Sequence, residues 1–149
     1  AERQIPHANI EYLCDSGTEF GGLKIWGSPW TKRFDGENRR CLAFTCDTEE
    51  ELAEKWTMFP ADTDILVTHS PAFWYGDVRA DGRPVGSTSL RLKIRHMALR
   101  EQRLKLHVFG HIHEAYGADY GDATVMWRVN ASYVNEHYEP VNGVVRVVV

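Results

Sequence analysis

Apolar residues recur along the chain in short blocks, and the spacing within each block predicts the element it forms. Short apolar runs bounded by Gly, Pro or polar residues predict strands at Ile10–Leu13, Leu23–Trp26, Cys41–Thr45, Asp64–Thr68, Leu106–Phe109, Thr124–Asn130 and Val144–Val149. Apolar residues three to four positions apart predict a helix that starts at Thr48 and another over Thr88–Arg103. This order predicts an α/β layered domain whose sheet is parallel in the middle and antiparallel at its close.

Local signals mark the first helix and the two long loops. Thr48 followed three residues later by Glu51 fits a capping box, in which each side chain binds the other residue's backbone N–H. Apolar residues then recur at helical spacing, namely Leu52, Trp56 and Phe59. The polar stretch Trp30–Arg40 and the Pro- and Gly-interrupted stretch Ser70–Gly86 predict loops.

The composition is that of an ordinary folded domain. The 149 residues are 43% hydrophobic and 26% charged, with a formal net charge of −4, which excludes intrinsic disorder, collagen and coiled coil. No linker divides the chain, so residues 1–149 are expected to form one unit. No apolar run approaches the roughly 18 residues that a membrane span needs, and no signal peptide is visible. We therefore expect no membrane partner.

The cysteines point to a reducing compartment. Cys14, Cys41 and Cys46 are odd in number and have no CxxC spacing, which argues against a disulfide framework or a zinc knuckle. Free thiols that pack as small apolar side chains are the simplest interpretation. The expected location is therefore intracellular, in the cytoplasm.

Positive charge is concentrated in one segment. Residues 79–105 hold eight basic side chains and two acidic ones, whereas the rest of the chain is acidic. Such a local field attracts anions, phosphates among them, although a solvated helix face explains most of these residues. No known nucleic-acid-binding module matches the segment, so nucleic acid is not an expected partner.

Histidines follow two of the predicted strands. His69 comes directly after Asp64–Thr68, and His111 and His113 come directly after Leu106–Phe109. Ligands of α/β sheets bind outside the carboxyl ends of the strands, and imidazole is the commonest metal ligand in proteins. If the two strands are parallel neighbours, the three imidazoles meet at one sheet edge and favour a metal site. The other four histidines have no such pattern: His107 is expected to pack inside its strand, and no role is assigned to His7, His96 or His137.

Two longer segments carry a family resemblance. Asp64–Pro71 and Leu106–Gly117, supported by Gly27–Trp30 and Val129–Ser132, resemble the last two motifs of the calcineurin-like metallophosphoesterases. The branch they resemble is the metallophosphoesterase-domain-containing one, close to the class III cyclic-nucleotide phosphodiesterases. The similarity runs from about residue 10 to residue 149.

The resemblance implies a fold and a chemistry. Members of the family are four-layer α/β/β/α sandwiches that hold two divalent metal ions, commonly Mn, Fe or Zn, and hydrolyse phosphoesters by attack of a bridging hydroxide on phosphorus. Carried over by motif, His69 and His111 bind one ion and His113 binds the other. Ions about 3.5–4 Å apart lower the pKa of a bridging water and clamp the attacking and leaving oxygens. The implied substrate is a phosphoester or a cyclic nucleotide. The Ser70–Gly86 loop contains three aromatic residues that would either stack on the base of the nucleotide or simply pack in the fold: Phe73, Trp74 and Tyr75.

The earlier motifs of the family, Asp-x-His, Gly-Asp and Gly-Asn-His, are not found in their expected order. The chain therefore resembles the C-terminal half of the sandwich, and residues 1–149 are expected to be a partial domain. In the first hypothesis, an enzyme is completed by an N-terminal half on a missing segment or a companion chain. In the alternative, the chain is a catalytically inactive remnant that serves as a structural subunit of a larger assembly.

Overall fold

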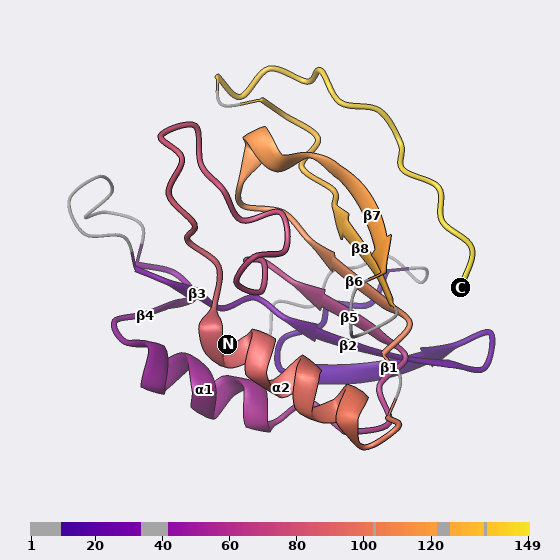
Figure 1. The fold of residues 1–149 in the computed structure, drawn as a ribbon. Coiled ribbons are helices and arrows are strands. Elements are labelled where there is room, and N and C mark those ends of the chain that lie inside the picture. The colour runs from indigo at the N-terminus through magenta and orange to yellow at the C-terminus, as the bar shows by residue number, and fades with distance from the viewer. Residues whose placement is uncertain (1–9, 34–41, 103, 122–125, 136) are drawn as a thin grey trace.

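Six strands form one mixed sheet, and two helices cover one of its faces (Figure 1). The computed structural model describes residues 10–33, 42–102, 104–121, 126–135 and 137–149. In spatial order the strands are β1 (Ser16–Phe20), β2 (Leu23–Ser28), β5 (Ile65–Thr68), β6 (Leu106–Phe109), β8 (Met126–Asn130) and β7 (Gly117–Gly121). The four inner strands are parallel, and β1 and β7 join the two edges antiparallel. The expected α/β class, with its parallel middle and antiparallel close, is confirmed.

The helices are α1 (Glu49–Thr57) and α2 (Thr88–Leu99). The predicted capping box begins α1, because the Glu51 backbone N–H donates to Thr48 Oγ1 over 3.2 Å. Apolar side chains of both helices pack on Leu66, Phe109 and Met126 of the sheet, and the helical members of this core are Leu52, Trp56, Leu90, Ile94 and Met97. Removal of this apolar surface from water is the main force that fixes the helices on the sheet.

A buried polar junction fixes the helix starts relative to each other. The Glu49 carboxylate of α1 accepts hydrogen bonds from the Ser87 hydroxyl (2.6 Å) and the Ser89 backbone N–H (2.8 Å). The Trp56 indole N–H donates to the same Ser87 hydroxyl over 2.9 Å. Because Ser87 caps α2, this junction also fixes the end of the long loop that follows β5.

The first hairpin differs from its prediction. Ile10–Leu13 is not in a strand, and β1 begins at Ser16 instead. The tight turn at Gly21 and Gly22, both with positive φ, pairs Phe20 with Leu23 and sets the register of the hairpin. Turn geometry, rather than the apolar run before it, therefore decides which residues pair with β2.

Other element boundaries also differ. β7 was not expected, because its sequence GADYG has no apolar run or strict alternation. A short separate pair, β3 (Thr31–Lys32) and β4 (Thr45–Cys46), uses residues from the predicted loop 30–40 and the end of the predicted strand 41–45. Residues 34–41, 103 and 124–125, which belonged to predicted elements, lie outside the described residues. The second helix ends at Leu99.

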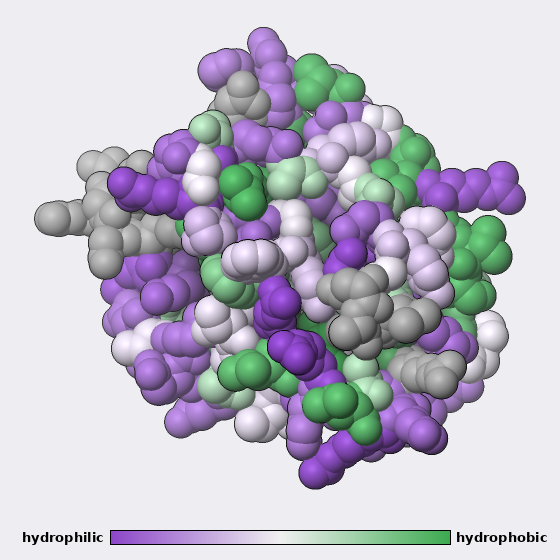
Figure 2. Space-filling model, viewed as in Figure 1, coloured by the Kyte–Doolittle hydropathy of each residue, from purple (hydrophilic) through white to green (hydrophobic). Residues whose placement is uncertain are grey.

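The predicted strand Val144–Val149 does not form a ladder with any described strand. The segment is held by side chains instead: the Trp127 indole N–H donates to the Val148 carbonyl (3.1 Å), and the Tyr116 hydroxyl donates to the Gly143 carbonyl (3.0 Å). Val144 is 98% exposed and Val148 is 81% exposed. Figure 2 shows hydrophobic side chains spaced along the edge of the molecule that this C-terminal segment follows in Figure 1.

The sheet face opposite the helices is also apolar. The strand register places Val67, Val108 and Val129 side by side in one row, and Val67, on a central strand, remains 39% exposed. Parallel strands are usually covered on both faces. The second sheet of a four-layer sandwich is not present among the residues described, so that part of the expected fold stays a prediction.

The described cysteines are free thiols, Cys14 and Cys46, and Cys41 lies outside the described residues. Burial, assisted by the nearby negative charge of Glu51, raises the pKa of the Cys46 thiol. This side chain is 5% exposed and packs in the core.

Neither α1 nor α2, the α-helices of the described ranges, is long and apolar enough to cross a bilayer.

Candidate functional site

Two of the three histidines that follow strands meet where β5 and β6 end. The strands are parallel neighbours, and the Gly110 backbone N–H donates to the His69 carbonyl over 3.0 Å, which ties the two strand ends together. His69 Nε2 lies 2.9 Å from His111 Nδ1, and the ring centroids are 4.6 Å apart. The sheet edge therefore brings together two imidazoles that are 42 positions apart in the sequence.

The backbone at His111 is strained. Its φ is +69°, and the Ile112 N–H donates to the Gly110 carbonyl over 2.8 Å, so His111 occupies the centre of a γ-turn with positive φ, a rare and strained form. Buried Asn130 holds this turn in place, because its side-chain N–H donates to the Ile112 carbonyl over 2.7 Å. Strain of this kind is concentrated at functional sites.

His113 begins the short 3₁₀ helix η1 (His113–Ala115). Its Nδ1 lies 2.9 Å from the Asn135 carbonyl. A carbonyl only accepts hydrogen bonds, so Nδ1 carries the proton and Nε2 keeps its lone pair. A backbone carbonyl that orients an imidazole in this way is the usual outer-shell partner of a metal-binding histidine.

The surroundings favour the neutral form of two of these imidazoles. Burial, followed by the positive charges of His69, His113 and Arg79, lowers the pKa of His111 to about 4. The His69 side chain keeps part of its surface exposed, and its pKa is lowered by partial desolvation of the ring and then by the charge of His113. A neutral imidazole has a free lone pair, with which it can bind a metal cation or accept a proton.

The donor set fits part of a metal centre. Two imidazole nitrogens bound to one ion at about 2.0–2.1 Å lie roughly 3 Å apart, which agrees with the 2.9 Å between His69 Nε2 and His111 Nδ1. The three imidazoles offer no anionic donor. Within the part of the chain that the structure describes, no group of three His, Cys, Asp or Glu side chains is placed to hold an ion. The histidines therefore fit as an incomplete ligand set.

His107 has a supporting role that the sequence did not reveal. It is fully buried, as expected for a packed strand residue. Thr68 Oγ1 donates to the Ser70 carbonyl (2.6 Å) and lies 2.8 Å from His107 Nε2. Because the single hydroxyl proton goes to Ser70, the Nε2–H of His107 donates to Thr68. These hydrogen bonds of Thr68 to Ser70 and His107 hold the backbone on both sides of His69. In the sequence, the only sign of this role of His107 is that a polar residue lies inside an apolar strand.

Burial lowers the pKa of His107 to about 3, and this predicts a loss of stability in acid. Unfolded His107 takes up a proton below about pH 6.5, whereas folded His107 does so only near pH 3, so stability falls as the pH decreases through this window. We expect His107 to cost about 2 kcal/mol of unfolding free energy between pH 7 and pH 5. Urea unfolding of His107→Gln at both pH values should show a smaller loss than wild type.

The control for this measurement is His96→Gln. His96 is exposed on α2 and should leave the pH dependence unchanged. An equal loss of stability in wild type and His107→Gln would contradict the prediction. The lowered pKa of His111 acts in the same direction and remains in the variant, so we expect a reduced pH dependence and not a flat one.

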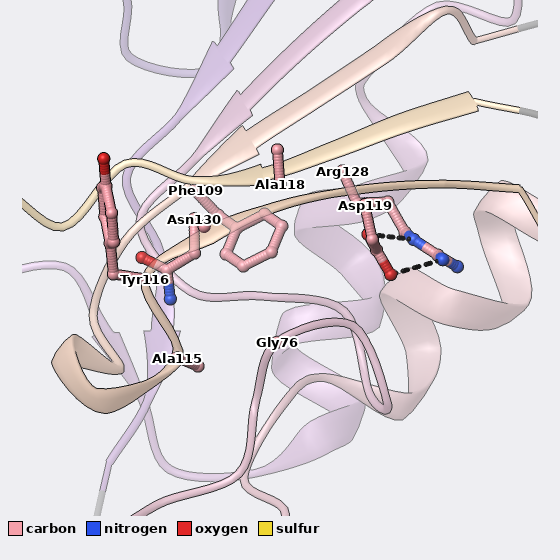
Figure 3. Close-up of a pocket in the computed structure, with 9 residues that line it drawn as sticks. Gly76, Phe109, Ala115, Tyr116, Ala118, Asp119, Arg128 and Asn130 are labelled. Carbon is pink, nitrogen blue, oxygen red and sulfur yellow. Dashed lines mark hydrogen bonds and ion pairs between the residues drawn. The ribbon is translucent and has the colours of Figure 1, made fainter. Parts of the chain in front are cut away.

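A cavity of about 250 Å³ lies behind η1, lined on one side by Ala115 and Tyr116 (Figure 3). Arg128 and Asp119 form a double hydrogen bond at its wall, over 2.8 and 2.6 Å. The Arg128 guanidinium also lies 4.6 Å from the centre of the Tyr75 ring. None of the three clustered histidines lines this cavity.

The remaining sequence candidates are dispersed. Of the three loop aromatics, Tyr75 is buried and packs, whereas Trp74 is 69% exposed with a φ of +68°. His137 lies near the C-terminal segment, in the turn that Asn135 organises, and His7 lies outside the described residues. Phe73 is partly buried, so Trp74 is the most exposed of the three aromatic residues.

Comparison with known proteins finds related sequences of greater length. Metallophosphoesterase domain-containing protein 1 of Homo sapiens is 38% identical over 135 residues, which cover 90% of this chain and 38% of that protein. A UPF0046 protein of Caenorhabditis elegans is 33% identical over 132 residues, which cover 89% of this chain and 31% of that protein. The chain thus spans between about three-tenths and four-tenths of the length of these relatives. The similarities support assignment to the metallophosphoesterase family.

The fold has a more distant structural counterpart. One solved crystal structure superposes with a TM-score of 0.55 at 12% sequence identity, covering 80% of this chain and 45% of the other. At this identity the likeness concerns the fold alone. No family model matches the chain.

Proposed function

We propose that this chain is the C-terminal half of a metallophosphoesterase domain and contributes three histidine ligands to a metal-dependent phosphoester hydrolase. The observation that carries the proposal is the meeting of His69 and His111 at the ends of β5 and β6, with His113 close enough for its charge to lower the pKa of both. The sequence similarity to a metallophosphoesterase domain-containing protein supports the same family.

His69 and His111 would hold one divalent ion, and His113 would hold the other. When bound, the two ions would supply activation of water and neutralisation of charge on the phosphoryl group. The protein's own part is to place the imidazoles. Gly110 and Asn130 hold the His111 turn, and the Asn135 carbonyl orients His113.

The acidic ligands would come from an N-terminal half, either on a segment of the same polypeptide or on a companion chain. Two surfaces support this part of the proposal. The apolar row that contains Val67 needs a covering layer, and the valine-rich segment 144–149 is extended without a ladder partner among the described strands. The relatives, of which this chain matches less than half, have the additional length that such a layer needs.

A phosphoester, including a cyclic nucleotide, is the proposed substrate class. Neutral imidazoles that bind divalent ions suit a phosphoryl group whose charge those ions neutralise. Trp74, exposed on the loop after His69, is the residue on which a base would stack.

Intact mass and hydrolysis of the natural protein test the proposal. A mass well above 17.1 kDa would place the N-terminal half on the same polypeptide, and a mass near it would require a companion chain. In either case we expect the natural protein to cleave bis(p-nitrophenyl) phosphate with Mn²⁺, to lose activity in EDTA and to regain it with metal. This chain alone should be inactive. A metal-loaded natural protein that cleaves neither phosphodiesters nor phosphomonoesters would refute the proposal.

A further inference from the structure

The end of β2 lies beside His69 at the same sheet edge. β2 and β5 are parallel neighbours (Figure 1), and their register pairs Ser28 with Thr68, the residue before His69. On the other side of His69, the Ser70 hydroxyl donates to the Trp30 carbonyl over 3.3 Å. The chain just before and just after His69 is therefore tied to the end of β2 and to the turn that follows it.

Asp15 holds that turn in place. Its carboxylate accepts two hydrogen bonds of 2.7 Å, one on each oxygen: the Ser28 hydroxyl donates to Oδ1 and the Trp30 indole N–H donates to Oδ2. Hydrogen bonds to an ionised acceptor are stronger than those between neutral groups. Ser28 is 3% exposed, so its hydroxyl needs a partner within the protein. The carboxylate thus fixes both ends of the Ser28-Pro29-Trp30 sequence.

The segment that carries Asp15 is itself packed closely on β2. A methyl group built on Gly27 would overlap Leu13 Cβ, so the two segments meet where only glycine fits. The backbone φ of Asp15 is +48°, in the left-handed region that Asp and Asn adopt more readily than most residues. This conformation turns the Asp15 side chain to the end of β2, where it meets both of its donors.

We propose that Asp15 is a positioning residue for the His69 imidazole and acts through Trp30 and Ser70. The inference rests on the proposed function, in which His69 is a metal ligand. On the β6 side, the Gly110 N–H already holds the His69 carbonyl. The hydrogen bonds from Asp15 to Trp30 and from Trp30 to Ser70 hold the chain on the β2 side. A ligand whose backbone is fixed on both sides loses less conformational entropy when its ring binds an ion.

Zn²⁺ binding by this chain, measured by isothermal titration calorimetry, tests the inference. Asp15→Asn keeps the size of the side chain and adopts the same backbone conformation, but it has one acceptor oxygen in place of two. We expect Zn²⁺ to bind about 10-fold more weakly, as for the loss of an outer-shell partner. Without metal, NMR of the ring nitrogens should show that the hydrogen bond between His69 Nε2 and His111 Nδ1 is weakened in the variant.

Two further variants make the test specific. Trp30→Phe removes the indole donor and keeps an aromatic ring, so it should also weaken Zn²⁺ binding. Combined with Asp15→Asn it should add nothing, since both changes break the same link. The matched control is Asp64→Asn, just before β5, because this carboxylate also has two partners, the Lys24 backbone N–H (2.9 Å) and the Lys105 ammonium (3.2 Å). Asp64→Asn should bind Zn²⁺ as wild type does.

Wild-type Zn²⁺ affinity in Asp15→Asn, an equal loss in Asp64→Asn, or an unchanged ring-nitrogen spectrum would overturn the inference. His69→Ala separates it from the proposed function. If His69→Ala loses Zn²⁺ binding and Asp15→Asn does not, the positioning role fails and the ligand role stands. If His69→Ala binds Zn²⁺ as wild type does, the ligand role fails and the inference fails with it. Absence of Zn²⁺ binding by the wild-type chain would also overturn the inference, whereas hydrolysis by the natural protein would still decide the proposed function.

Discussion

His69→Ala is expected to lower phosphoester hydrolysis by the natural protein by more than about 100-fold, because even outer-shell partners of metal ligands contribute 10- to 100-fold. His69 is exposed at the end of β5, so the fold should tolerate the substitution. It removes the imidazole whose Nε2 lies 2.9 Å from His111 Nδ1. The measurement is kcat/KM together with the metal content of the purified protein, and both should fall.

The control for this variant is His96→Ala, on the exposed side of α2, which should keep wild-type turnover and metal content. Equal urea unfolding midpoints of the two variants would show that the loss arises at the site and not from unfolding. Wild-type turnover by His69→Ala would contradict the assignment of this histidine as a ligand.

Gly86→Ala is expected to destabilise the fold by about 3 kcal/mol. The added methyl group would lie 2.7 Å from the carbonyl carbon and oxygen of Ala72 and from the Phe73 backbone nitrogen. These are backbone atoms, and they cannot move aside easily. The Phe73 N–H donates to the Ser87 carbonyl over 2.9 Å, and the Ser87 N–H donates to the Pro71 carbonyl over 3.0 Å. The clash therefore separates the start of the long loop from the start of α2.

Urea unfolding measures this effect, with Gly143→Ala as the matched control. A methyl group on Gly143 would meet nothing within 4 Å, so that variant should lie within about 0.5 kcal/mol of wild type. A Gly86→Ala midpoint equal to that of Gly143→Ala would contradict the expected clash.

The sequence predicted those features whose physical cause is local. The capping box at Thr48 needs only residues three positions apart, and the apolar blocks of β5 and β6 need only their own composition. The positions of His69 and His111 directly after these strands follow from the same blocks. Parallel neighbours then bring the histidines to one edge, which the strand order bears out.

Other features depend on partners far away in the chain. β7 has little strand signal of its own and forms because its backbone pairs with β8. The segment 144–149 has a strong strand signal but no ladder partner among the described residues. A strand is stabilised by hydrogen bonds to a neighbour, so its own residues do not determine whether it pairs.

The sequence by itself determined the α/β class, the two helices and the three histidines that follow strands, because these depend on spacing along the chain. Only the tertiary structure decided the 2.9 Å approach of His69 to His111, the strained turn at His111 and the hydrogen bond from Asn130 that holds this turn. The reason is that each of these depends on contacts between distant segments. Such contacts form only when the packed core offsets the entropy lost in closing the long loops between them.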